Sequence, residues 1–328
     1  MKLTYIIVSY NEKEYLEEAI QSCLCQDVSD FEIIIGDDGS SDGSIELIET
    51  YAAKFPKIIR YFIQERKGVT AQNVIASLRV SNVIMRALEL ALGEYCVILS
   101  GDDYFYKGGF FHKAIDYLDN HSKYVAYIGS FEKVWEDKPA IVYDKPYPPK
   151  LYWGSGKYIH VSAFVFRKSV FDKGCFLQRF CDDVGLVYAL LEEGKWKYDK
   201  EVMFAYRQRS GSIMHTSDSM IFRIGEVMIL QDTLCKGVAY KESFAHFANS
   251  LQYVFVHRKD LGKEAYSKYM SNCQKYEKNI LNDIYMYDRS SLTKKCEVRS
   301  WLIYANFQRF IYRTVVRVYH IYLKMSRR

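Results

Sequence analysis

A short apolar run that ends in two adjacent carboxylates is the feature that most constrains this 328-residue chain. Residues 96–99 are rich in Val and Ile, a composition typical of a strand buried on both faces. Ser100 and Gly101 break the run, and Asp102 and Asp103 follow at once. Open α/β sheets bind ligands at the carboxyl ends of their strands. Because neighbouring carboxylates repel each other, such a pair usually shares hydrogen-bond donors or a hard divalent cation.

Strand-like and helix-like segments alternate through the first hundred residues. Apolar runs predict the strands, and apolar residues at helical spacing predict the helices between them. The expected strands are 3–8, 31–35, 58–63 and 95–99. Three helices are expected between them: the first at 13–26, the second beginning after a cap at Ser41 or Asp42, and the third at 78–92. This alternation predicts an α/β fold with a parallel, doubly wound sheet.

Polar loops follow three of these strands, at residues 9–12, 37–40 and 102–103. The carboxyl ends of parallel strands meet at one edge of a sheet, so we expect the three loops to converge on a ligand. Each loop also has a plainer explanation. The pair at 102–103 can be a solvated turn, 37–40 a tight turn that caps a helix, and 11–12 the start of a helix.

Most of the positive charge lies at the end of the chain. The formal net charge is +5, and residues 294–328 hold nine Lys or Arg and one Glu, so this tail carries +8 and residues 1–293 carry −3. The distribution argues against nucleic acid as a partner of the chain as a whole.

Nothing in the sequence indicates export or a membrane span. Met1 leads straight into a strand-like run without a cleavage pattern, and no run approaches about 18 apolar residues. The eight cysteines contain no CxxC pair. We therefore expect a cytoplasmic protein with reduced, mostly packed thiols.

Three motifs in a fixed order resemble a known family. They are Ile-Val-Ser-Tyr-Asn-Glu at 7–12, Asp-Asp-Gly-Ser-Ser-Asp-Gly-Ser at 37–44, and Gly-Glu-Tyr at 93–95 followed by Gly-Asp-Asp-Tyr at 101–104. Their order and spacing resemble the family 2 glycosyltransferases with the GT-A fold, over residues 3 to about 217. The resemblance implies a Rossmann-like, mostly parallel central sheet flanked by helices. It also implies transfer of a sugar from a nucleotide sugar with inversion.

The resemblance implies roles for residues at the sheet edge. Donor-binding roles fall on the first loop and on both carboxylate pairs: Ser9, Tyr10 and Glu12 for the nucleotide, Asp38 for uracil N3–H and Asp102 for the ribose. Asp103 would bind Mn²⁺ or Mg²⁺ across the two phosphates of a UDP-sugar. The cation would then offset the charge that builds on the leaving diphosphate.

The chain departs from the family pattern at two places. Many members carry Arg-Asn shortly before Gly-Glu-Tyr, but Met85 stands at the usual Asn position, so a shifted helix would let Arg79 or Asn82 contact the donor. Arg209 stands where His is usual in a Tyr-Arg-x-His segment. Arginine cannot bind a metal, although it binds phosphate bidentately. His215 is then either a metal ligand or a structural histidine.

The segment after residue 104 is expected to serve the acceptor. Inverting transfer needs a carboxylate near the acceptor hydroxyl, and Asp183 takes the position of the family's catalytic base. Alternatively, Asp183 only caps the helix that follows it. Residues 139–156 are expected to form a loop over the site, and 160–166 a strand beside the acceptor.

The C-terminal region is predicted to be helical from about residue 222. In its last helix, basic residues fall on one face and apolar residues on the other, a pattern that suits an anionic membrane surface. A helix packed on the domain or on a second subunit, as in a homodimer, fits the same pattern.

These observations predict a GT-A domain at 1–217, divided into a nucleotide-sugar part (1–104) and an acceptor part (105–217), with a helical C-terminal extension at 218–328 that ends in a basic helix at 299–328. The expected function is metal-dependent, inverting transfer of one sugar from a UDP-sugar to a glycan or lipid-linked glycan of a bacterial surface polysaccharide. The expected location is the inner face of the plasma membrane, as a peripheral protein.

One alternative is an inactive nucleotide-sugar binder or scaffold. The other is a processive polysaccharide synthase, although its Gln-x-x-Arg-Trp motif and membrane spans are absent from the sequence.

Overall fold

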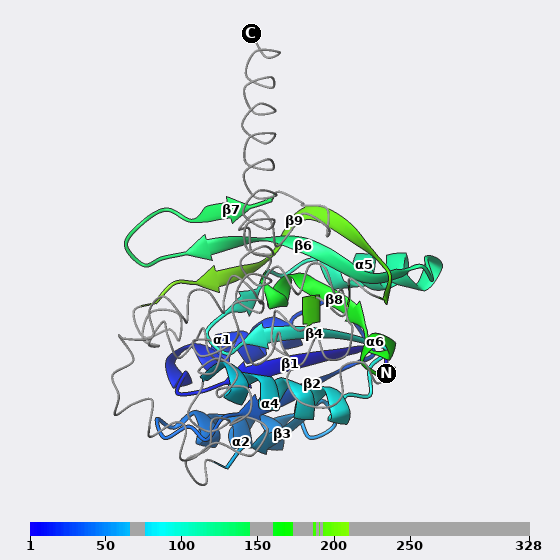
Figure 1. The fold of residues 1–328 in the computed structure, drawn as a ribbon. Coiled ribbons are helices and arrows are strands. Elements are labelled where there is room, and N and C mark those ends of the chain that lie inside the picture. The colour runs from blue at the N-terminus through cyan, green and yellow to red at the C-terminus, as the bar shows by residue number, and fades with distance from the viewer. Residues whose placement is uncertain (66–75, 145–159, 173–185, 188–189, 191–192, 210–328) are drawn as a thin grey trace, which may run out of the picture.

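The structure is a computed structural model that describes residues 1–65, 76–144, 160–172, 186–187, 190 and 193–209 (Figure 1). Its elements are β1 (Leu3–Ser9), α1 (Lys13–Leu24), β2 (Phe31–Asp37), α2 (Ser44–Lys54), β3 (Ile59–Ile63), α4 (Ala76–Leu90), β4 (Tyr95–Ser100), β5 (Tyr104–Phe105), α5 (Phe110–Asn120), β6 (Tyr124–Val134), β7 (Ile141–Tyr143), the 3-10 helix η3 (Val161–Ala163), β8 (Phe164–Arg167), α6 (Ser169–Asp172) and β9 (Lys195–Arg207). The strands form one sheet in the order β3-β2-β1-β4-β8-β6-β9-β5, with β7 paired to β6.

The N-terminal half of the sheet is parallel, as the sequence predicts. β1 lies between β2 and β4, so Leu3 is aligned with both Phe31 and Tyr95. β3 continues the parallel order beyond β2. Because connections between parallel strands need a crossover, the helices α1, α2 and α4 lie between successive strands in the chain. The predicted α/β class is confirmed.

The second half of the sheet is mixed. β8 pairs antiparallel with both β4 and β6, which joins the two halves. β6 and β9 run parallel over a long register, and β5 pairs antiparallel with β9. Figure 1 shows β6, β7 and β9 above the blue parallel strands at the bottom of the sheet. This arrangement brings the end of β9 back to the edge where β1 and β4 end.

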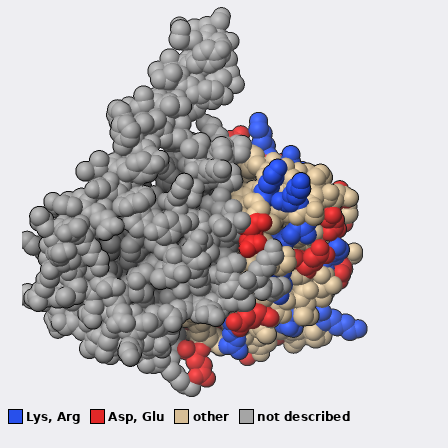
Figure 2. All heavy atoms as spheres, turned by 45° about the vertical axis from the view of Figure 1, so that its right-hand side comes forward, with Lys and Arg blue, Asp and Glu red and all other residues tan. Residues whose placement is uncertain are grey.

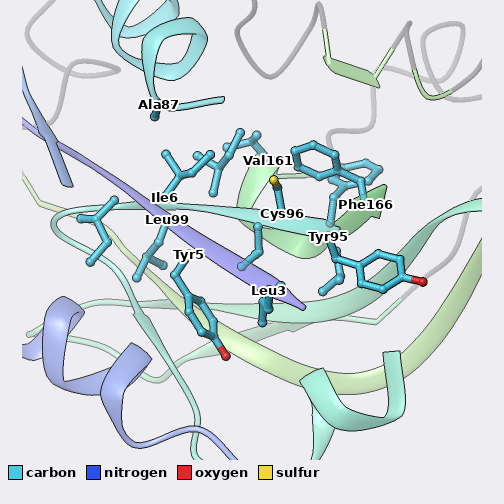
Figure 3. Packing of buried hydrophobic residues seen from close by; sticks show 14 of the residues in the cluster. Leu3, Tyr5, Ile6, Ala87, Tyr95, Cys96, Leu99, Val161 and Phe166 are labelled. Atoms are coloured by element: carbon cyan, nitrogen blue, oxygen red, sulfur yellow. The ribbon is translucent and has the colours of Figure 1, made fainter. Parts of the chain in front are cut away.

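The core covers both faces of the central strands. Figure 3 shows Ile6 on the side of the sheet that faces Ala87 of α4, whereas Tyr5 points to the opposite side. The Tyr5 ring packs edge-on against Phe111 of α5, with 5.1 Å between ring centroids. Ile6, Tyr5 and Ala87 are all completely buried. Burial on both faces explains why β1 is a continuous apolar run.

The predicted cap of α2 is wrong by one or two residues. The N-cap is Gly43, whose φ of 95° lies in the left-handed region that favours glycine. Asp42 still supports the helix start from one position earlier, because its Oδ1 accepts the Ser44 N–H at 3.0 Å. The glycine lets the chain turn sharply between that carboxylate and the helix.

Two predictions for the second half need correction. The expected strand at 160–166 begins with η3, because the Ala163 N–H donates to the His160 carbonyl and closes a tight turn before β8. The expected loop at 139–156 contains the short strand β7, which extends the sheet beside Phe131. The rest of that loop, from residue 145, and the helical C-terminal extension lie outside the described residues.

The described surface carries charges of both signs. On the face in Figure 2, basic and acidic side chains are interspersed over the part that is not grey. This agrees with the small net charge of residues 1–293. Among the described residues, no helix has the length and apolar character needed to cross a membrane.

Gly93→Ala should destabilise the fold. A Cβ there would lie 2.6 Å from the Thr4 backbone nitrogen and 2.7 Å from the Tyr95 carbonyl oxygen, atoms of the paired strands β1 and β4. Since these backbone atoms cannot move without disturbing the sheet, we expect the free energy of unfolding to fall by about 1–3 kcal/mol, the usual cost of overpacking. Urea denaturation measures this change.

The matched control is Gly108→Ala, where a Cβ would meet only Glu201 Oε1, at 3.8 Å. We expect that change to stay within about 0.5 kcal/mol. Equal urea midpoints for the two variants would contradict the packing argument.

Candidate active site

The three polar loops predicted to converge lie side by side. The register pairs Ser9 with Asp37 across β1 and β2, and Val8 with Ser100 across β1 and β4. Because these strands are parallel, the loops after them leave the same edge of the sheet. The antiparallel pairing of Tyr104 with Ala205 adds the end of β9 to this edge.

Hydrogen bonds tie the first loop to the second. The Asn11 N–H donates to Ser40 Oγ at 2.8 Å, and the Ser41 N–H donates to Asn11 Oδ1 at 2.9 Å. Asn11 has a φ of 52°, a left-handed conformation that asparagine tolerates better than most residues. Asp37 is fully buried, and its two oxygens accept both the N–H and the hydroxyl of Ser40. Asp37 therefore fixes the conformation of the second loop, whereas Asp38 and the first loop lie at the edge of the sheet.

Asp38 lies at the end of β2 with cationic and amide partners. Arg79 Nε donates to one carboxylate oxygen at 2.7 Å, and Gln64 Nε2 donates to the other at 2.7 Å. The Arg79 guanidinium also stacks over the Tyr10 ring, 5.6 Å from its centroid. The structure thus brings together Tyr10, Asp38 and Arg79, three of the residues predicted to bind the donor.

Arg209 bridges the first loop and the loop after β4. Its Nε donates to Asp102 Oδ2 at 2.6 Å, and its Nη2 donates to Glu12 Oε1 at 2.6 Å. Burial opposes the charge on Arg209, but Asp102 and Glu12 outweigh it and raise its pKa. The guanidinium is therefore a permanent cation between two carboxylates.

Glu12 lies partly buried against Gly101 of the next loop, with 12% of its side chain exposed. A Cβ on Gly101 would lie 2.5 Å from Glu12 Oε2, so a side chain there would push this carboxylate out of its position. Among the described residues, Oε2 has no hydrogen-bond partner. Burial and the neighbouring Asp102 raise the pKa of Glu12, and the opposing effect of Arg209 is smaller.

Asp103 is a fully buried carboxylate at this edge. Its Oδ1 accepts the Arg207 N–H at 2.9 Å, whereas its Oδ2 has no hydrogen-bond partner in the described part of the chain. Burial raises the pKa of Asp103, and repulsion from Asp102 raises it further. A buried oxygen without a donor is costly unless something else satisfies it.

His160 lies beside that oxygen. Its Nε2 is 3.9 Å from Asp103 Oδ2, and its Nδ1 accepts the Ser162 N–H at 3.2 Å. Burial lowers the pKa of His160 to about 3, with a smaller contribution from Lys133, so the imidazole is neutral. A neutral ring that accepts at Nδ1 carries its proton on Nε2, which faces the carboxylate.

Asp103 fits a hard cation. Such cations prefer carboxylate oxygens, and Oδ2 is a buried oxygen to which no described residue donates a hydrogen bond. Within the described ranges, no group of three or more His, Cys, Asp or Glu side chains could hold a metal. Asp103 would therefore hold a cation together with oxygens supplied from outside the described residues, such as the phosphates of a ligand.

The structure gathers most of the predicted site residues at one edge. They are Ser9, Tyr10, Glu12, Asp38, Arg79, Asp102 and Asp103. Ser9 Oγ is buried there without a hydrogen-bond partner among the described residues. The predicted base Asp183 and the candidate metal ligand His215 lie outside the described residues.

Four residues make contacts at this edge that the sequence did not predict: Gln64, His160, Arg207 and Arg209. The Arg207 guanidinium donates to the Asp102 carbonyl at 2.8 Å and to Glu18 at 2.6 Å. A signal for Arg207 and Arg209 existed, because two arginines two residues apart at a strand end point to the same side. Gln64 and His160 carry no comparable sequence signal.

Comparisons with known proteins agree with this geometry. Residues 4–175, slightly more than half of the chain, match the family model described as glycosyl transferase family 2. An uncharacterised protein of Mycobacterium tuberculosis is 29% identical over 149 residues, which cover 45% of this chain and 39% of that protein. The chain thus spans well under half the length of this relative.

Two further relatives match more of the chain. Glycosyltransferase GlyG of Streptococcus pneumoniae is 26% identical over 231 residues, which cover 65% of this chain and 73% of GlyG. The crystal structure of S. aureus TarS 1-349 in complex with UDP-GlcNAc aligns with a TM-score of 0.59 at 16% identity, over 98% of this chain and 92% of that one. At this identity the likeness shows a shared GT-A fold. The family match and the fold together show that the chain belongs to the family 2 glycosyltransferases.

Proposed function

We propose that this chain is a metal-dependent, inverting glycosyltransferase that moves one sugar from a UDP-sugar to a glycan acceptor. One observation carries the proposal. Asp38 with its Arg79 partner, the partly buried Glu12, and the buried Asp102 and Asp103 lie at a single carboxyl edge of a parallel sheet. In a family 2 chain, this edge has the place and the chemistry of a nucleotide-sugar site.

The donor base would bind near the end of β2. A carboxylate offers about four acceptor positions, so Asp38 can accept a uracil N3–H while Arg79 and Gln64 hold it in place. Asp102 would accept hydrogen bonds from the ribose. TarS has been crystallised with UDP-GlcNAc and with UDP, which supports testing uridine donors first.

Asp103 would hold Mn²⁺ or Mg²⁺ together with the donor diphosphate, and His215 remains a candidate second ligand. When bound, the cation offsets the negative charge that develops on the leaving diphosphate. The chain's own contribution is to hold Asp103 in place, since the Arg207 N–H fixes one oxygen and leaves the other available. Burial also keeps this carboxylate away from bulk water.

The acceptor step would use Asp183. Its carboxylate takes the proton of an acceptor hydroxyl, and the hydroxyl oxygen attacks the anomeric carbon from the face opposite the diphosphate. The bond between that carbon and the diphosphate oxygen breaks, and the nucleoside diphosphate leaves. Attack from the opposite face inverts the anomeric centre.

We further propose that the acceptor is a growing surface glycan of a bacterium, carried on a lipid. The basic helix predicted at 299–328 would hold the chain at the anionic inner face of the plasma membrane, where such an acceptor lies. Alternatively, that helix packs against a second subunit.

Asp103→Asn should abolish metal-dependent binding of UDP while the fold survives. Asn has the size of Asp and can still accept the Arg207 N–H through its amide oxygen, but it lacks the negative charge that attracts a cation. Calorimetry with UDP and Mn²⁺ tests the prediction, and thermal unfolding checks the fold. Asp116→Asn, on the exposed side of α5, is the matched control. Unchanged Mn²⁺-dependent affinity in Asp103→Asn would remove the metal role.

Asp183→Asn should lower kcat by about 100-fold or more, the usual size of a general-base contribution. Affinity for UDP should stay the same, because the base acts on the acceptor side. UDP release is the assay, run on a donor and acceptor pair found by screening UDP-sugars. The neighbouring Asp182→Asn is the control and should keep its turnover. Wild-type turnover in Asp183→Asn would leave that residue as a helix cap.

Removal of residues 299–328 should release the chain from vesicles of phosphatidylglycerol and phosphatidylcholine. Each Lys or Arg near an anionic surface contributes about 1 kcal/mol, and salt screens this attraction. A variant with Arg309, Arg313 and Arg317 changed to Gln keeps the apolar face and should lose only the salt-sensitive part. Vesicle sedimentation at low and high salt measures both effects. If the full chain ignores these vesicles, or if truncation changes only its oligomeric state, the helix is a packing element.

A further inference from the structure

Arg209 occupies an unusual position at the sheet edge. Its guanidinium contacts Glu12 and Asp102, each at 2.6 Å, and its charge also lies 5.4 Å from the centre of the Tyr15 ring. The Arg209 side chain is 19% exposed, so a ligand can reach it from solvent. By the resemblance, Arg209 stands where the family pattern has His, and its guanidinium places a positive charge there.

The charges of this edge show what such a cation can do. Arg209 hydrogen-bonds both Glu12 and Asp102, and Asp103 follows Asp102 directly in the chain, so three carboxylates lie together. A diphosphate that entered next to these carboxylates would be repelled unless positive charge were already there. Arg209 supplies that charge, and the two carboxylates hold it in place.

The guanidinium keeps hydrogen-bonding capacity for a ligand. It has five N–H donors, and its contacts with Glu12 and Asp102 involve only Nη2 and Nε. Neither of these two hydrogen bonds uses Nη1. Guanidinium and phosphate form short, strong, often bidentate hydrogen bonds, so these remaining donors match the oxygens of a diphosphate.

We propose that Arg209 binds the donor diphosphate directly, as a fixed cation that takes over part of the role of a divalent metal. This inference rests on the proposed function, because it assumes a nucleotide-sugar donor at this edge. It predicts that the chain binds a nucleoside diphosphate measurably even when no divalent cation is present. Mn²⁺ at Asp103 then adds affinity to a site that already carries positive charge.

Calorimetry with UDP, GDP and ADP, each in EDTA and in Mn²⁺, tests this proposal on the full chain. The nucleotide that binds wild type most tightly in Mn²⁺ is then used for the variants. We expect wild type to bind it in EDTA, and Arg209→Gln to bind it at least about tenfold more weakly there, the size of one hydrogen bond between charged groups. In Mn²⁺ the loss should be smaller, because the cation supplies part of the missing charge.

Two further variants separate charge from geometry. Arg209→Lys keeps the charge but not the planar fork, so its affinity in EDTA should lie between wild type and Arg209→Gln. Arg209→His should bind weakly in EDTA and regain affinity in Mn²⁺. The control is Arg86→Gln, which removes one positive charge from the exposed side of α4 and should bind like wild type.

The outcomes separate this proposal from the one on which it rests. If none of the three nucleotides binds wild type in Mn²⁺, the proposed function fails and this inference fails with it. If a nucleotide binds in Mn²⁺ but not in EDTA, or if Arg209→Gln binds as well as wild type in EDTA, the donor site stands and only the role of Arg209 is overturned. If thermal unfolding shows that Arg209→Gln does not fold, Arg209→Lys and Arg209→His replace it in the test. The affinity of these variants in EDTA is then compared with that of wild type.

Discussion

The hydrogen-bond ladders on both sides of β1 are the interaction on which the rest of this structure depends. They align Ser9 with Asp37 and Val8 with Ser100, so that three loops leave the sheet at one level. Burial of β1 on both faces fixes that register, because a shift by one residue would turn Tyr5 and Ile6 to the wrong sides. The position of every carboxylate at the edge follows from this alignment. The chemistry of the site is therefore a consequence of how an apolar strand packs.

The sequence was sufficient to predict the parallel half of the fold and the residues gathered at its edge. The runs around Ile6, Ile34 and Ile98 are short, apolar and separated by helical patterns, so local composition determines them. The mixed half was harder. β8 and β9 pair with strands far away in the chain, and no local pattern shows that 160–163 tightens into a 3-10 helix. The contact of Arg209 with Glu12 spans 197 residues, which explains why motif spacing alone could not find it.

Most carboxylates at the edge have partners within the described part of the chain, although they outnumber the arginine side chains that pair with them. Asp38 is paired with Arg79, Asp102 and Glu12 with Arg209, and the Arg207 N–H contacts Asp103. Buried ion pairs contribute little net stability, because desolvation of the charges offsets much of their attraction. Their presence here fits a site that must keep charged groups in fixed positions for a charged ligand. Among the described residues, Asp103 Oδ2 is the exception, because it is buried without a hydrogen-bond donor.

The strand order also has a consequence for how the protein is made. During synthesis β1 to β4 leave the ribosome first, but β8, which covers the free edge of β4, begins only at Phe164. An uncovered edge strand can pair with other chains, so the emerging parallel half is exposed to aggregation until the later strands arrive. The site edge is completed later still, when the segment after β9 emerges. A truncated or stalled chain that ends before residue 164 would thus carry the three motifs of residues 7–12, 37–44 and 93–104. It would nevertheless expose the edge of β4, the strand that the last of these motifs contains.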